Sequence, residues 1–265
     1  MRRHVRAAGV AALVSGLTFV ACTTVEGTGR ERLAPFPESY MEKIGVQAYA
    51  QERSQNKIDA NPTVNTEVDE IARRIEKATG KGFAWQVTVF DSKEVNAWCL
   101  PGGKIGVYTG ILPVAQTNAG LATVIGHETG HAVANHGGER MSEQLLVSGA
   151  MLTAEELLGS NSSERQLALA ALGLGAQVGI VLPFSRTQEA EADHLGLMYM
   201  AKAGYDPHEA VALWERMTKL GGEPVAFLSD HPASKDRVKA LEELLPQALA
   251  LWEKSDKVPT KPLTY

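Results

Sequence analysis

The chain has 265 residues, of which 44% are hydrophobic and 22% are charged, and its formal net charge is −5. This composition is typical of a globular protein with a substantial core, and it argues against a disordered chain or a protein with several membrane spans. Because the basic residues form no cluster, nucleic acid is not expected as a partner.

Residues 1–21 are expected to be a secretory signal peptide. Three arginines among the first six residues precede the apolar run Ala7–Ala21, which is too short to favour a membrane-spanning helix. The run ends directly before Cys22, and this junction resembles a bacterial lipobox, in which the cysteine becomes the lipidated first residue. An ordinary cleaved signal with an incidental cysteine is the alternative. The resemblance implies a lipid anchor in the bacterial cell envelope, and Thr23 implies the outer membrane, with the protein facing the periplasm.

Residues 22–37 are rich in glycine, threonine, proline and charged residues, and we expect them to form a tether. One domain is predicted over residues 38–252. It begins with helices at Ser39–Lys57 and Val64–Thr79, the second of which has apolar residues at helical spacing. Residues 253–265 are polar and contain two prolines, so a flexible tail is expected.

Three short segments rich in β-branched and aromatic residues are predicted to be strands, at Phe83–Phe90, Val95–Leu100 and Lys104–Tyr108. They come before the segment with the clearest chemical signal, so a small sheet is expected beside a helix. An edge strand of such a sheet can pair with an extended peptide, or the strands can merely cover the core. The residues alone leave both interpretations open.

The segment Gly126–His131 carries two histidines four residues apart, with a glutamate directly after the first. A helix is predicted over Gly120–Asn135, which places His127 and His131 on one face, where two neutral imidazoles can bind one zinc ion. Glu128 lies about 100° round the helix, from where its carboxylate can act as a general base on a zinc-bound water. A chance match on an amphipathic helix is the alternative.

Two further features follow this segment. His136 is rotated about 140° from His131 on a continuous helix, so we expect it beside the site or at the surface and not as a ligand. Leu167–Leu182 has sixteen residues without a charge, fewer than a membrane span usually needs. A buried core helix is therefore favoured there over a membrane-touching or lid element.

A second helix is predicted from Ser185, which is a suitable N-cap. On this helix Glu189 and Asp193 share one face, whereas Glu191 points about 200° away from Glu189. One of the first two carboxylates can complete a zinc site, and the other can accept the spare N–H of a ligand histidine. Replacement of Glu191 is expected to do little. A solvated acidic helix N-terminus is the alternative.

The C-terminal part is predicted to contain two more helices. Asp206 and Pro207 indicate the start of one, and Lys235–Leu251 is amphipathic. A loop is expected over Ser229–Ser234. His231 lies in that loop, where a residue lining a cleft is more usual than a core residue, although a surface histidine is the alternative.

Together these motifs resemble the gluzincin metallopeptidases that include HtpX, the CAAX prenyl proteases and the BepA and LoiP type. The resemblance spans about Val64 to Leu244 and is carried by Gly-His-Glu-x-x-His and Ser-Arg-x-x-Glu-x-Glu-Ala-Asp. It also includes the shorter matches Asn96-Ala97-Trp98 with Pro101-Gly102-Gly103-Lys104-Ile105, and His231-Pro232 with Arg237. It implies an α+β, mainly helical fold, a zincin-like domain with a small sheet next to the HExxH helix. The tetratricopeptide array of longer members is not expected.

The resemblance also implies roles for individual residues. One Zn2+ per chain is expected, held by His127, His131 and Glu189, with Glu128 as general base. His231 is expected at the metal, either as a latch on the fourth zinc position or as a donor to the substrate oxyanion. Asp193 and Arg237 are expected behind the ligands. Substrate is expected on Asn96, Ala97 and Trp98.

The implied activity is that of a zinc-dependent endopeptidase of the bacterial cell envelope. Its expected substrates are proteins or peptides, in particular misfolded or misassembled envelope proteins. The outer-membrane assembly machinery is a further expected partner. The alternative is a chaperone-like binding protein that assists outer-membrane assembly with little proteolysis.

Overall fold

The computed structural model describes residues 22–34, 36–148, 184–220, 225–232 and 235–265. The expected signal peptide and the apolar segment Leu167–Leu182 lie outside the described residues. The helices are α1 (Glu38–Gln55), α2 (Pro62–Thr79), the 3-10 turn η1 (Thr109–Ile111), α3 (Leu112–Ala115), α4 (Asn118–Ala134), α5 (His136–Ser148), α9 (Arg186–Lys202), α10 (His208–Thr218), α11 (Ala226–Asp230) and α12 (Lys235–Trp252). The strands are β1 (Cys22–Thr24), β2 (Glu31–Leu33), β3 (Gln86–Phe90), β4 (Ala97–Leu100) and β5 (Lys104–Tyr108).

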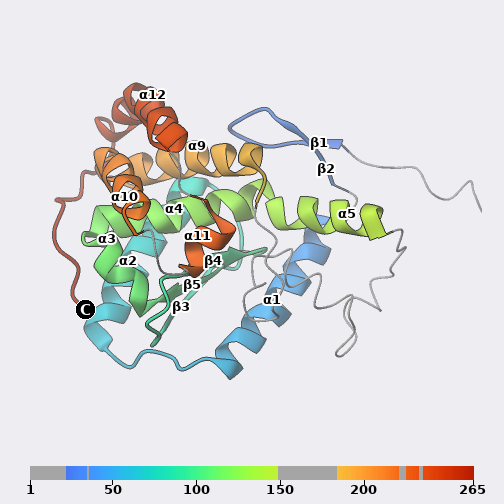
Figure 1. Cartoon of the computed structure of the whole chain (residues 1–265), viewed down its shortest axis with the longest axis horizontal. Coiled ribbons are helices and arrows are strands. Elements are labelled where there is room, and N and C mark those ends of the chain that lie inside the picture. Colours follow the sequence, from blue (N-terminus) through green and yellow to red (C-terminus); the bar gives the residue numbers. More distant parts are fainter. Residues whose placement is uncertain (1–21, 35, 149–183, 221–224, 233–234) are drawn as a thin grey trace, which may run out of the picture.

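The predicted sheet has the strand order β3-β5-β4. β3 pairs with β5 in parallel, and β4 pairs with β5 antiparallel, which leaves β4 at an edge. Figure 1 shows α4 between this sheet and α9, with α12 on the far side of α9. The fold is therefore mainly helical with a small sheet beside α4, as expected.

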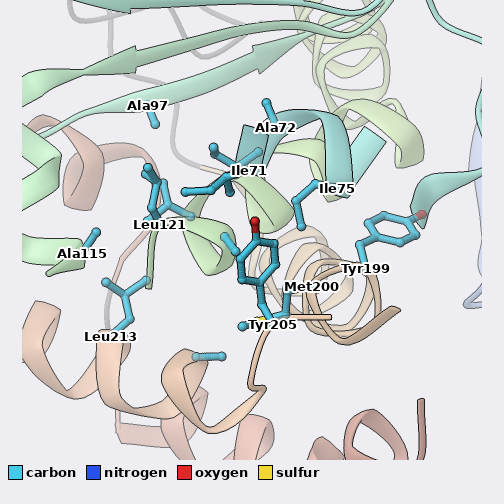
Figure 2. Packing of buried hydrophobic residues seen from close by; sticks show 14 of the residues in the cluster. Ile71, Ala72, Ile75, Ala97, Ala115, Leu121, Tyr199, Met200, Tyr205 and Leu213 are labelled. Carbon is cyan, nitrogen blue, oxygen red and sulfur yellow. The ribbon is translucent and has the colours of Figure 1, made fainter. Parts of the chain in front are cut away.

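Helix α4 occupies the centre of the molecule, and every one of its residues is buried. A helix can be buried all round only if its neighbours cover every face, which α2, α9, α10 and the sheet do here. In Figure 2, Ile71 and Ile75 of α2, Leu121 of α4 and Met200 of α9 gather in one apolar cluster. This core fixes the helix that carries the two histidines.

Helices α4 and α9 approach each other at four small residues, two from each helix. A Cβ placed on Gly126 would lie 2.9 Å from the carbonyl oxygen of Gly196, and one on Gly130 would lie 2.8 Å from that of Ala192. These separations are shorter than atomic contacts allow, so only glycine fits at positions 126 and 130. The backbone of α9 is thereby held directly against the histidine-bearing turn of α4.

The chain on each side of the expected domain is packed against it. Residues 22–33, which we expected to belong to a tether, form an antiparallel hairpin of β1 and β2, with Val25 buried. At the other end, Pro262 forms a bridge with Thr117 and Leu263 is buried. Both segments were expected to be mobile because their composition gives only weak local preferences for a helix or strand. Composition does not report the tertiary contacts that hold these segments in place.

The predicted loop Ser229–Ser234 is partly helical, because α11 continues to Asp230. No helix among the described residues combines the length and the apolar character needed to cross a bilayer.

Candidate metal centre

Four buried side chains direct one ligand atom each towards a common point. These are His127 and His131 of α4, Glu189 of α9 and His231 at the end of α11, and their ligand atoms all lie within 4.8 Å of one another. The Nε2 atoms of the two α4 histidines are 3.1 Å apart. The Nδ1 of His231 is 3.1 Å from Nε2 of His127 and 2.8 Å from Oε1 of Glu189.

These separations fit a zinc ion. Two ligands that are each about 2.0–2.1 Å from one tetrahedral ion lie roughly 3.3 Å apart. Three imidazoles and one carboxylate also form a donor set that binds zinc in preference to calcium or magnesium. The four residues can therefore hold one zinc ion, with either three or all four of them bound.

Electrostatics prepare these groups for a cation. Burial lowers the pKa of His127 and His131 well below the ordinary value, so both rings are neutral and keep a lone pair for a metal. Burial alone would raise the pKa of Glu189, but His231 and Arg237 hold that pKa well below its usual range. An anionic carboxylate thus meets two neutral imidazoles.

Glu128 lies beside the ligand atoms and is buried. Among the described residues its Oε1 has no hydrogen-bond partner, only a 3.4 Å contact with Nε2 of His231. Burial raises the pKa of Glu128 to about 7. A carboxylate with a free oxygen and a pKa near neutrality is suited to accept a proton from a bound water.

Behind His127 lie the carboxylate of Asp193 and the guanidinium of Arg237. Oδ1 of Asp193 is 3.0 Å from Nδ1 of His127, and Nη2 of Arg237 donates to the same oxygen over 2.7 Å. Nη1 of Arg237 donates to Oε2 of Glu189 over 2.6 Å. Arg237 also lies over the ring of Trp214, with 3.4 Å between its central carbon and the ring centroid. The structure therefore brings both expected supporting residues to the ligands.

His231 directly follows the last residue of α11, Asp230, and lies outside the helix, as expected. Its main-chain N–H donates to the carbonyl of Phe227, and its ring stacks on Phe184 with 5.2 Å between centroids. Burial would lower the pKa of His231, but the carboxylates of Glu189 and Glu128 together raise it. The ring is 4% exposed, so the alternative of a surface histidine is wrong.

The edge strand offers mostly main-chain groups and not all of the side chains that the sequence motif emphasised. Because Tyr108 donates its N–H to the carbonyl of Asn96, the alternation of an antiparallel pair turns the main-chain groups of Ala97 and Cys99 away from β5. The ring of Trp98 is buried against Tyr49. Trp98 therefore supports the sheet, and a substrate at this edge would meet backbone and the side chain of Asn96, whose Oδ1 accepts the N–H of Ala97 over 2.9 Å.

Two further residues lie near His131, of which Glu191 was missed, whereas His136 was expected beside the site or at the surface. Glu191 was expected to point away from the metal without consequence, yet it is buried and bonded to His136 and Arg30. His136 in turn contacts Nδ1 of His131. His136 thus lies beside the site, as one of the two expectations had it, although α4 and α5 are not one continuous helix: Asn135 between them has φ 53° and ψ 41°.

A model of peptidase family M48 matches residues 59–245, which include all four clustered residues and their supports. The chain belongs to peptidase family M48. This membership and the cluster confirm three expectations: the zincin-like fold, the class of zinc metalloendopeptidase, and zinc as the cofactor.

Relatives within the M48 family come from mitochondria and from bacteria. Mitochondrial metalloendopeptidase OMA1 of Schizosaccharomyces pombe is 39% identical over 200 residues, 71% of this chain and 55% of that protein. OMA1 of Danio rerio is 33% identical over 245 residues, 84% of this chain and 50% of that protein. Metalloprotease LoiP of Escherichia coli is 30% identical over 193 residues, 70% of this chain and 75% of that protein. The chain thus spans about half the length of these mitochondrial relatives.

The expected location in a bacterial outer membrane, facing the periplasm, is contradicted. Its basis was a few residues around Cys22, whereas similarity to enzymes named as mitochondrial extends over 200 residues at 39% identity. An arginine-rich N-terminus without acidic residues does not decide the matter, because secretory signals and mitochondrial transit peptides share that property. The similarity to LoiP is as expected, at lower identity than that to the OMA1 enzymes.

Proposed function

We propose that this M48 protein is an endopeptidase that cleaves extended segments of misfolded proteins. The single observation that carries the proposal is the free, buried oxygen of Glu128 beside the ligands His127, His131 and Glu189. When bound, zinc supplies a Lewis acid that lowers the pKa of a water and polarises a carbonyl. Glu128 takes the proton of the attacking water on Oε1 and later gives it to the leaving amine.

The substrate class follows from the edge strand. The carbonyl of Ala97 and the main-chain groups of Cys99 face away from β5, whereas the N–H of Ala97 is donated to Oδ1 of Asn96, so an extended peptide could add to β4 at the remaining main-chain groups. At Val95 this edge is already taken, because Phe227 donates its N–H to the carbonyl of Val95. A peptide must be unfolded locally to present a free strand, and misfolded proteins meet that requirement.

The test compares wild type with Glu128→Gln, and Glu143→Gln serves as a control on an exposed glutamate. One substrate protein is supplied both folded and unfolded. Wild type and Glu143→Gln should cut the unfolded form faster, and Glu128→Gln should keep zinc but lose about 10²–10⁴-fold in rate. Full activity of Glu128→Gln would overturn the proposal. A Glu128→Gln variant that cuts nothing but still binds the unfolded substrate protein and prevents its aggregation as wild type does would instead support the binding-protein alternative.

For His231 we propose a role on the metal side of the cleft. Its Nδ1 lies among the ligand atoms and its Nε2 faces Glu128, so the ring can occupy the fourth zinc position or donate to a substrate oxyanion. In His231→Ala, higher basal proteolysis at unchanged zinc content would indicate a latch, and a large fall in turnover would indicate the oxyanion role. Unchanged activity and zinc affinity would remove His231 from the site.

We also propose that Cys22 carries a lipid. Its side chain is exposed on β1, where it is accessible to modification. Mass spectrometry of the protein purified from membranes should show diacylglyceryl on Cys22. A Cys22→Ser protein that partitions with membranes as wild type does would contradict this. The assembly machinery expected as a partner presupposed the outer membrane, and it is not proposed.

A further inference from the structure

His131 has a second interaction that points away from the ligand cluster. Its Nε2 faces the other ligand atoms, and its Nδ1 lies 2.8 Å from Nδ1 of His136. The turn between the helices makes this contact possible, because Asn135 adopts a left-handed conformation that ends α4 and starts α5. Asparagine tolerates that conformation better than most residues. His136 is completely buried by this return of the chain.

Metal binding determines which ring nitrogens carry the hydrogen atoms in this contact. If His131 binds zinc through Nε2, its proton is on Nδ1 and is donated to His136. His136 must then accept on Nδ1 and carry its own proton on Nε2. That nitrogen lies 2.9 Å from Oε2 of Glu191, which accepts the proton's hydrogen bond. One arrangement of protons therefore satisfies His131, His136 and Glu191 together.

Glu191 is fixed in turn by the N-terminal hairpin. Thr28 donates its hydroxyl to Oε1 of Glu191, and Nε of Arg30 donates to Oε2 over 2.7 Å. The other two nitrogens of Arg30 bind both oxygens of Glu139 in α5, over 2.8 and 2.9 Å. Glu139 also accepts from Gln188 at the start of α9. Arg30 thus ties α5 and α9 to the hairpin at the point where Glu191 meets His136.

We infer that His136 and Glu191 are positioning residues for the ligand His131, and that Arg30 of the hairpin completes this support. The inference rests on the proposed zinc site. Ligand histidines usually donate their second N–H to a carboxylate, a carbonyl or a water, which fixes the ring and raises its basicity. Here an imidazole stands in that place, and the carboxylate lies one residue further out. The hairpin, far from the HExxH segment in the sequence, is then part of the metal site.

The experiment separates this role from simple attachment of the hairpin. Zinc affinity is measured by competition with a chelator, and the Co2+-substituted protein gives an absorption spectrum that reports ligand geometry. The melting temperature of the metal-free protein reports folding. The variants are His136→Ala, His136→Asn, Glu191→Gln and Arg30→Ala, with controls His208→Ala and Arg73→Ala. His208 and Arg73 make comparable contacts with aspartates at the exposed surface.

His136→Ala should weaken zinc binding about 10–100-fold and alter the cobalt spectrum. His136→Asn should recover part of that loss, because its Oδ1 can replace the accepting Nδ1. Glu191→Gln and Arg30→Ala should have smaller effects of the same kind, and the controls none. If His136→Ala does not fold, the isosteric Glu191→Gln decides the matter.

Lower melting temperatures with unchanged zinc affinity and spectra would overturn the inference, because the network would then only attach the hairpin. That result differs from failure of the proposed function. If wild type itself binds no zinc or cuts no peptide, the function is wrong. If wild type binds and cuts while all variants keep its affinity, only the support of His131 is wrong.

Discussion

His127 and His131 lie one turn apart on the same helix, but different parts of the molecule stand behind them. Asp193 contacts His127 directly, and that carboxylate belongs to the same helix as the ligand Glu189. His131 instead contacts His136, and the carboxylate of Glu191 follows as the next member. The first support comes from α9, with Arg237 of α12 bound to it, and the second joins α5, α9 and the N-terminal hairpin. Loss of the Asp193 contact should therefore affect His127 directly, whereas loss of the Glu191 contact should affect His131 only through His136.

Removing the ligand that both sides share should have the largest effect. Glu189→Ala deletes a zinc ligand and leaves Arg237 without one of its two buried carboxylate partners. Loss of a supporting residue typically lowers metal affinity 10–100-fold, so loss of this ligand should exceed about 100-fold. Metal analysis after gel filtration should find little zinc. Stoichiometric zinc in Glu189→Ala, with none in Glu191→Ala, would reverse our assignment of the ligand.

Breaking the direct support should come next. Asp193→Asn keeps the size of the side chain but removes the charge that faces His127 and Arg237, so zinc affinity should fall about 10–100-fold. Glu191→Gln should cost about tenfold or less, because an imidazole separates it from the ligand. Chelator competition measures both, with the half-exposed Asp69→Asn as control. Equal losses for the two variants would show that distance from the ligand does not matter.

Disturbing the contact between α4 and α9 should affect the supports of His127 and His131 equally. A Cβ on Gly196 would lie 2.7 Å from the main-chain nitrogen of His127, so Gly196→Ala forces α9 away from α4. Overpacking of this kind typically destabilises by about 1–3 kcal/mol. Urea unfolding of the metal-free protein measures it. The control Gly82→Ala meets open space and should change stability by less than about 0.5 kcal/mol.

The smallest effect should be a loss of folding stability at acid pH that arises from the contacts on the His131 side. Burial raises the pKa of Glu139, but hydrogen bonds from Arg30 and Gln188 outweigh burial and lower that pKa below 4.5. The stabilisation by these hydrogen bonds is therefore complete at pH values above the ordinary pKa of 4.5. It is lost as the pH falls through the lowered pKa of Glu139 in the folded protein. Glu139→Gln should remove this part of the pH dependence, on the order of 1 kcal/mol for a partly exposed pair. Urea midpoints of both proteins across the acid range test it, and parallel curves would contradict it.

The same contrast explains what the sequence could predict. The spacing of His127 and His131, and the shared helix face of Glu189 and Asp193, depend only on local geometry, which the chain repeats faithfully once it is helical. Hence the strand Lys104–Tyr108 and the N-cap Ser185 were predicted correctly. These are local features.

The features that were missed or left open are all non-local or depend on one backbone angle. The position of His136 depends on the left-handed Asn135, and a periodicity argument assumes that no such break occurs. The role of Glu191 depends on Arg30, which lies in a segment that looked like a tether. Charge and composition describe such a segment before it folds but do not say which buried carboxylate it will meet.

The contact between glycines of α4 and α9 has a consequence for how the protein folds. The close approach of the two helices requires Gly126 to face Gly196, because a Cβ at either position would collide with the backbone of the other helix. Rotation of α9 by one residue would carry Glu189 about 100° away from the histidines. Intermediates in which the helices are apart or out of register therefore lack a ligand. Zinc held by all three groups therefore stabilises the docked chain more than these intermediates, because the intermediates offer only the two histidines of α4.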